Sequence, residues 1–141
     1  HPEIGVKSAF ICESRLNEPR DCYYYRFIPD IPGDDNPGTF HSVDLWFFFD
    51  TIAKCTRPYT GRHYDLARQM SSYWVNFIKT GDPNGKDRNG EALPKWDKYT
   101  EDNRAEMLFT SEGAKSAAAE SEFVSFLANA TVMREMGGKT K

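Results

Sequence analysis

The stretch GTFHSVDLWFFFD, residues 38–50, places a histidine between a glycine-containing loop and a dense aromatic run. The preceding residues 29–40 contain three prolines and two glycines, which predict a loop. From Ser42, a favoured helix N-cap residue, the sequence predicts a short and mostly buried helix, although its aromatic content would suit a strand equally well. His41 is therefore either a structural histidine at the edge of a core or a base at the mouth of a pocket.

Two segments on either side of this stretch have the composition of strands. Residues 22–28, CYYYRFI, are rich in aromatic side chains and stop at Pro29, which predicts a strand buried on at least one face. Residues 105–110, AEMLFT, are a second and weaker candidate. Two strands do not make an independently stable sheet. The remaining strands are therefore expected in another polypeptide or in an N-terminal region.

The clearest helical pattern covers residues 64–79, and Gly81 suits the left-handed position after its end. Its apolar residues recur at spacings of four, three and four, and this stripe comprises Leu66, Met70, Tyr73 and Phe77, widened by Ala67, Trp74 and Ile78. All of these are expected in the core. Further helices are predicted over residues 8–16 and 120–136.

The totals exclude several classes of partner. The chain has 18 Lys plus Arg and 21 Asp plus Glu, a net charge of -3, and no basic run, so nucleic acid is not an expected partner. The longest apolar stretch, residues 45–49, is far shorter than the ~20 residues of a transmembrane helix. The first ten residues lack the pattern of a signal peptide, and the compartment stays open.

The three cysteines do not have the spacing of a metal site. Cys12, Cys22 and Cys55 form no C-x-x-C pair and have no histidine at zinc spacing, so no metal is expected. A disulfide between Cys12 and Cys22 is one alternative. Buried or free thiols are the simpler interpretation for an odd count in a chain of this length.

Four stretches together resemble one protein family. They are YYYRF, GTFHSVDLWFFF, MSSYWVNFIKTGDPNG and LPKWDKYT, in this order along the chain. In sequence and spacing they resemble the type-B carboxylesterases, relatives of the cholinesterases. The resemblance implies an α/β fold in which residues 1–141 form the C-terminal segment of one α/β-hydrolase domain, with its last sheet strands and their covering helices.

The resemblance also assigns roles to residues. His41 aligns with the catalytic histidine of the family. Asp44 stands where the family usually has glutamate, and it is expected to support the histidine loop. Phe40 and Trp46 are candidates for lining the substrate pocket. His63 has no such context and is expected to be a solvated or capping residue at the start of a helix.

Other parts of an esterase are not in this sequence. It contains no G-x-S-x-G, the nucleophile elbow of α/β-hydrolases, and the glutamates before His41 are too close to it in sequence to be the family's triad acid. The expected partners are therefore an N-terminal segment of the same esterase, which supplies the serine and the acid, and a small-molecule ester; no cofactor is required. The alternatives are a non-catalytic cholinesterase-like binding protein and a self-standing helical domain.

Overall fold

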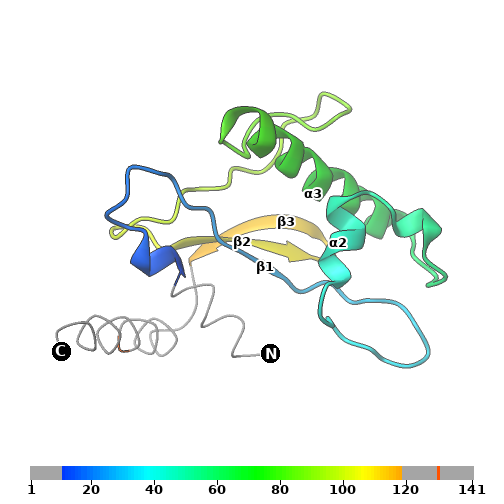
Figure 1. The fold of residues 1–141 in the computed structure, drawn as a ribbon. Coiled ribbons are helices and arrows are strands. Elements are labelled where there is room, and N and C mark those ends of the chain that lie inside the picture. The colour runs from blue at the N-terminus through cyan, green and yellow to red at the C-terminus, as the bar shows by residue number, and fades with distance from the viewer. Residues whose placement is uncertain (1–10, 119–129, 131–141) are drawn as a thin grey trace. The chain divides into compact units, whose positions relative to one another are not determined.

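The structure of the chain, a computed structural model, describes residues 11–118 and residue 130. Its elements in chain order are β1 (Tyr25–Phe27), α2 (Val43–Phe48), a 3-10 turn (Ile52–Lys54), α3 (Gly61–Thr80), β2 (Ala105–Thr110) and β3 (Gly113–Ala118) (Figure 1). Residues 11–14 of the predicted N-terminal helix are helical. Apart from residue 130, the helix predicted over residues 120–136 lies outside the described residues.

The chain forms two compact units. The larger comprises residues 25–96 and 107–116, and it contains β1, α2, α3 and most of the two remaining strands. The described residues of the other unit include 11–24 and 97–106. His41 and the other residues proposed for a site belong to the larger unit.

The strands form one sheet in the order β1-β2-β3. β1 and β2 are parallel, with Tyr25 opposite Met107 and Phe27 opposite Phe109. β2 and β3 are joined by two residues only, which requires an antiparallel pair. Among the described strands β1 therefore lies at an edge of the sheet, and one side of its backbone faces no other described strand.

The predicted strand boundaries were partly wrong. β2 has the predicted bounds, whereas β1 covers only three of the seven predicted residues, followed by a further backbone hydrogen bond from Ile28 to Phe109. β3 was not predicted. Its sequence GAKSAA has none of the β-branched or aromatic residues that mark strands, and it is a strand because a tight turn returns it along β2.

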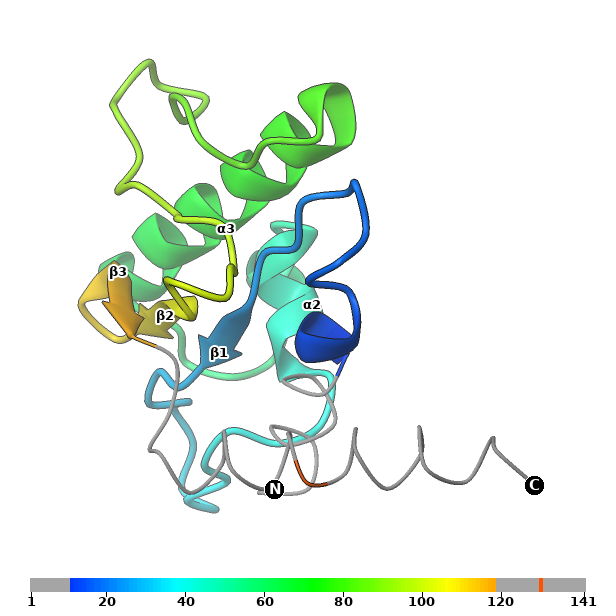
Figure 2. The ribbon, with the colours of Figure 1, turned by 90° about the vertical axis from the view of Figure 1, so that its left-hand side faces the viewer.

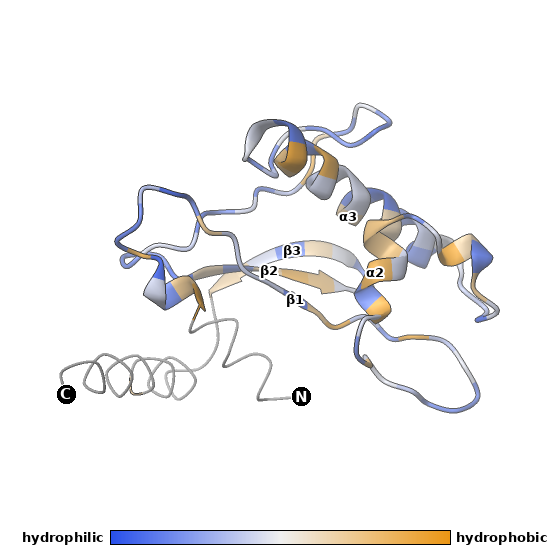
Figure 3. Cartoon of the chain, in the orientation of Figure 1, coloured by the Kyte–Doolittle hydropathy of each residue, from blue (hydrophilic) through white to orange (hydrophobic). Residues whose placement is uncertain are grey.

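Both helices pack on one face of this sheet. Tyr25 and Phe27 are two residues apart on β1 and so share a face. Tyr25 contacts Phe48 of α2 with ring centroids 5.3 Å apart, and Phe27 contacts Phe47 at 4.9 Å. Tyr73 of α3 reaches Phe109 on β2 at 5.9 Å. Figures 1 and 2 show α3 running above the strands, and Figure 3 shows apolar residues along β2 and α2.

The predicted burial of the apolar stripe of α3 is correct for the first turns of the helix and wrong for its last turn. Leu66, Met70 and Tyr73 are at most 1% exposed, whereas Phe77 is 45% exposed and Ile78 is 70% exposed. The end of α3 is exposed because the helix is longer than the strands on which it packs. A helix of 20 residues is about 30 Å long, whereas a strand of six residues spans about 20 Å, so the end of α3 extends beyond the sheet. Gly81 ends the helix in the predicted left-handed conformation, with φ of 79°.

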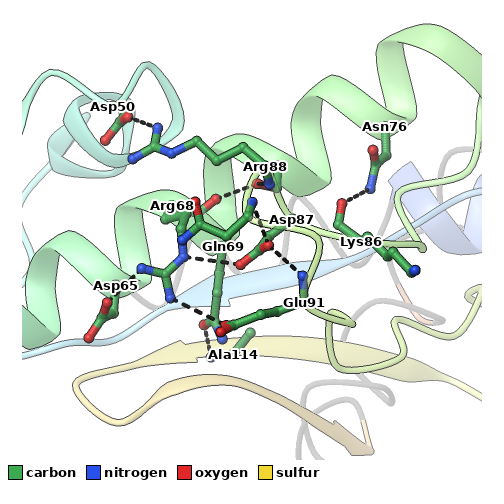
Figure 4. A network of polar contacts seen from close by, with 12 residues as sticks. Asp50, Asp65, Arg68, Gln69, Asn76, Lys86, Asp87, Arg88, Glu91 and Ala114 are labelled. Atoms are coloured by element: carbon green, nitrogen blue, oxygen red, sulfur yellow. Dashed lines mark hydrogen bonds and ion pairs between the residues drawn. The ribbon is translucent and has the colours of Figure 1, made fainter.

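A polar network attaches the loop after α3 to both helices (Figure 4). The buried carboxylate of Asp87 accepts the Arg68 Nε–H at 3.0 Å and the backbone N–H groups of Asn89 and Glu91. Although burial opposes its ionisation, these backbone donors and Arg68 hold the pKa of Asp87 below its usual value.

The same loop also contacts the end of α2. Arg88, the residue after Asp87, forms an ion pair with Asp50, which follows α2. The network therefore holds α2, the helix that directly follows His41, against the rest of the unit.

Candidate active site

His41 lies on the surface of the larger unit, directly before α2. Its imidazole is exposed, and its Nδ1 lies 2.6 Å from the Ser42 hydroxyl. In the part of the chain that the structure describes, this is the one hydrogen-bond partner of the ring. Nε2 therefore has no hydrogen-bond partner among the described residues.

Ser42 occupies the predicted N-cap position but does not cap the helix through its side chain. Its φ is 66°, in the left-handed region, and its hydroxyl makes no hydrogen bond to the helix backbone. A capping serine normally has extended backbone angles that aim its oxygen at the helix N–H groups. Here the left-handed turn directs the hydroxyl to the preceding histidine instead.

Asp44, in the first turn of α2, is tied to the sheet. The hydroxyl of Tyr25 on β1 donates a hydrogen bond to Asp44 Oδ2 at 2.9 Å. Burial and the negative charge of Asp44 raise the pKa of Tyr25 well above its usual value, so Tyr25 remains a donor. This bond fixes the start of α2, three residues from His41, to a strand. The sequence did not single out Tyr25, because nothing local distinguishes one of three consecutive tyrosines.

Arg57 stabilises the loop that precedes His41 through contacts with three of its residues. Its guanidinium forms a bidentate ion pair with Asp35, at 2.9 Å and 3.0 Å, and also donates to the carbonyl of Pro32 at 3.0 Å. Its Cζ lies 5.3 Å from the centre of the Phe40 ring. These contacts hold three points of the loop, the last of them adjacent to His41. No local sequence pattern indicates this role, because Arg57 and Asp35 are 22 residues apart.

The two residues predicted to line a pocket remain partly exposed. Phe40 is 40% exposed beneath Arg57, and Trp46 on α2 is 38% exposed. Phe40 stands beside His41 in the sequence, whereas Trp46 lies one turn into α2. Their role in a substrate pocket stays a prediction.

His63 is a capping residue, as predicted, but it is buried rather than solvated. Its side chain is 3% exposed, its Nδ1 accepts the backbone N–H of Thr60 at 3.0 Å, and its Nε2 lies 3.0 Å from the carbonyl of Asp30. Because Nδ1 accepts, Nε2 carries the proton and donates it to that carbonyl. His63 therefore connects the start of α3 to the segment after β1, a structural role.

Neither a metal site nor a membrane span is found in the described part of the chain. Across residues 11–118 and 130, no three histidine, cysteine or acidic side chains come together as metal ligands. In the same residues, no helix combines the length and the apolar character that crossing a bilayer requires. Of the three glutamates before His41, Glu13 is bound to Arg104 and Tyr99 within the other unit.

The parallel strand pair, the connecting helices on one face and the histidine loop at the end of a strand define a part of an α/β-hydrolase fold. Residues 6–127 match the family described as the carboxylesterase family. The chain belongs to this family, and the resemblance predicted from the sequence is confirmed.

Two acetylcholinesterases and a lipase are among the proteins whose sequences are similar to this chain. Acetylcholinesterase of Gallus gallus is 36% identical over 63 residues, which cover 45% of this chain and 8% of that protein. Acetylcholinesterase 1 of Caenorhabditis elegans is 31% identical over 98 residues, 67% of this chain and 16% of that protein. Bile salt-activated lipase of Homo sapiens is 31% identical over 91 residues, which cover 64% of this chain and 12% of that protein. The chain thus spans less than one fifth of each of these relatives.

Solved structures confirm the fold. The carboxylesterase EST55 of Geobacillus stearothermophilus, at pH 6.8, superimposes with a TM-score of 0.64 and 23% identity, over 82% of this chain and 24% of that one. A PNB esterase superimposes with a TM-score of 0.59 and 23% identity, over 77% of this chain and 21% of that one. The chain therefore has the structure of about one quarter of an α/β-hydrolase, as expected.

Proposed function

We propose that this chain is part of a serine carboxylesterase, in which His41 is the general base that acts on a serine supplied by another segment. The observation that supports this most directly is the place of His41. It is exposed on a loop after a strand, with Nε2 open, in a chain of the carboxylesterase family. Function in α/β-hydrolases depends on such a histidine meeting a serine and an acid in space.

The proposed chemistry has two stages. In the first, Nε2 of His41 takes the proton of the serine hydroxyl as its oxygen attacks the ester carbonyl, and then returns that proton to the leaving alcohol. In the second, the same nitrogen removes a proton from water, which attacks the acyl-enzyme and releases the acid. The triad acid would bind the Nδ1 side of the ring, which Ser42 contacts in this structure.

Asp44 is proposed as a positioning residue rather than a catalytic one. Its carboxylate is occupied by Tyr25 on β1, so it acts by fixing the first turn of α2. Arg57 acts in the same sense from the other side of His41, through its contacts to Asp35 and Phe40. The two clamps would hold the histidine loop in one conformation, as precise alignment with a serine requires.

The proposed partner is an N-terminal segment of the same esterase. Among the described strands β1 is an edge strand, which a further strand of a larger α/β sheet could extend. The end of α3 also leaves Phe77 and Ile78 exposed, which a larger α/β sheet with its helices would cover. That segment would supply the serine, the acid and the oxyanion hole.

The test is ester hydrolysis by the protein that contains this chain, with His41 replaced. We expect His41→Ala to lower kcat for a short-chain p-nitrophenyl ester by about 10⁴- to 10⁶-fold, with an unchanged melting temperature, because an exposed loop side chain contributes little to packing. Thr39→Ala, an exposed residue of the same loop, is the matched control and is expected to keep the wild-type rate. His63→Ala is not a suitable control, because His63 is buried and connects two elements.

The same experiment distinguishes the proposed enzyme from the alternative, a non-catalytic binding protein. A wild-type protein with no hydrolysis of any short-chain ester would favour the binding protein. A wild-type rate in the His41→Ala variant would show that hydrolysis does not depend on this histidine. Partial recovery of the His41→Ala rate by added imidazole would identify the missing group as the base.

A further inference from the structure

Two cysteines of the smaller unit lie in contact. Cys12, in the helical turn of residues 11–14, and Cys22, just before the aromatic run, have their sulfur atoms 3.0 Å apart. A disulfide bond is about 2.05 Å long, so the two sulfurs need to approach by only about 1 Å to form one. The sequence left the disulfide and the free thiols as alternatives; the structure places these two thiols together.

We propose that Cys12 and Cys22 are a redox-active pair, in which Cys22 is the attacking thiolate and the product is an intramolecular disulfide. The oxidant that we propose is a small-molecule disulfide such as glutathione disulfide. The proposal does not depend on the esterase reaction.

The surroundings of the pair differ for its two members. Cys12 is 4% exposed and packs with Tyr24 and Tyr99. Cys22 is half-buried, and both cysteines line a hollow at the surface, so a small reagent can reach the pair. The charged side chains around this hollow are Arg15, Arg20 and Lys98 of one sign and Glu18, Asp21 and Glu101 of the other.

The two thiols are also unequal as acids. A hydrogen bond from Cys12, followed by the charge of Arg15, lowers the pKa of Cys22 to about 7 against the opposing effect of burial. The pKa of Cys12 is raised, because its proton is held by Cys22 and because it is buried beside Glu13. Near neutral pH the thiolate, which is the nucleophile in disulfide exchange, therefore belongs mainly to Cys22.

The reaction balances in two exchange steps. The Cys22 thiolate attacks one sulfur of the small disulfide, the S–S bond of the reagent breaks, and one thiolate leaves and is protonated. Cys12 then loses its proton and attacks Cys22 Sγ, which breaks the mixed disulfide and releases the second small thiol. One small disulfide is reduced to two thiols, and two protein thiols are oxidised to one disulfide.

The product can be identified by mass spectrometry of the native protein treated with glutathione disulfide and digested without reduction. Trypsin cuts after Arg15 and Arg20, so Cys12 lies in SAFICESR, residues 8–15, and Cys22 in DCYYYR, residues 21–26. We expect these two peptides to be recovered as one linked species, which separates on reduction. Cys55, in CTRPYTGR, residues 55–62, is the internal control and is expected in no intramolecular link.

Two variants separate the roles of the cysteines. Cys12→Ser keeps a hydrogen-bond donor but cannot form the disulfide, so glutathione should stay attached to Cys22. Cys12→Ala removes the donor as well, so the pH midpoint of Cys22 alkylation by iodoacetamide should rise from about 7 toward about 8.5, whereas it should stay near 7 in Cys12→Ser.

Several results would overturn the proposal. Failure of the two peptides to link in glutathione disulfide, or a link from Cys22 to Cys55 in their place, would reject the pair. An equal alkylation midpoint in the wild type and in Cys12→Ala would reject Cys22 as the activated thiolate.

Discussion

The hydrogen bond between Tyr25 and Asp44 is the contact whose removal gives the sharpest test of how the histidine loop is held. Tyr25→Phe deletes one hydroxyl and keeps the ring, which packs against Phe48, Trp96 and Phe109 at centroid distances of 5.3 to 6.1 Å. A hydrogen bond to a charged group contributes about 1.5–3 kcal/mol. Asp44 is only half-buried and can take a water in exchange, so we expect a loss of about 1–2 kcal/mol.

The assay is urea unfolding of the protein that contains this chain, with Asp44→Asn and the double variant completing a cycle. If the two side chains act as a pair, the double variant loses little more than either single variant, and the coupling energy is about 1 kcal/mol. The esterase rate should fall in Tyr25→Phe while KM changes little, because the residue would orient the loop rather than bind the ester. Additive losses in the cycle would refute the pairing.

The same substitution has a predicted signature at alkaline pH. In the unfolded chain a tyrosine ionises near pH 10, whereas the pKa of Tyr25 is raised in the folded protein by burial and by Asp44. Above pH ~10 the folded state therefore binds a proton that the unfolded state has lost, and the free energy of unfolding falls as pH rises. Tyr25→Phe should weaken this dependence. An unchanged slope above pH ~10 would contradict the assigned environment.

Three further predictions concern packing, the contacts of Arg57 and the backbone before α2. Phe47→Ala, at a residue 0% exposed, should cost about 3–5 kcal/mol in urea unfolding. Phe77→Ala, at the end of α3 that the proposed N-terminal segment would cover, should cost more than about 1.5 kcal/mol, and a smaller loss would contradict that cover. Arg57→Ala should lower kcat by about 10- to 100-fold through misplacement of the loop, and adding Asp35→Ala should lower it little further. Ser42→Gly should raise the free energy of unfolding by about 1 kcal/mol, because glycine adopts the left-handed backbone without strain; a loss of stability would show that the hydroxyl contact to the histidine matters more.

The sequence alone determined the family and most of the helical core. The four motif stretches identified the carboxylesterase family, and the period of residues 64–79 identified α3 and four of its buried residues. Such signals are local. A helix buries a stripe with a 3.6-residue period, and that period is written in the chain before any tertiary contact exists.

The tertiary structure decided where those periodic signals stop and which distant residues meet. The stripe of α3 continues to Phe77 and Ile78, but their burial depends on how far the sheet extends beneath them. β3 has no strand composition and exists because β2 stands beside it.

Contacts between residues far apart in the sequence hold the histidine loop. Tyr25 donates a hydrogen bond to Asp44, 19 residues away in the sequence, and Arg57 forms an ion pair with Asp35, 22 residues away. No local pattern encodes such pairs, because a side chain's partner is set by chain closure in three dimensions. The sequence could therefore place His41 on a loop before a helix, but only the folded chain shows what holds that loop.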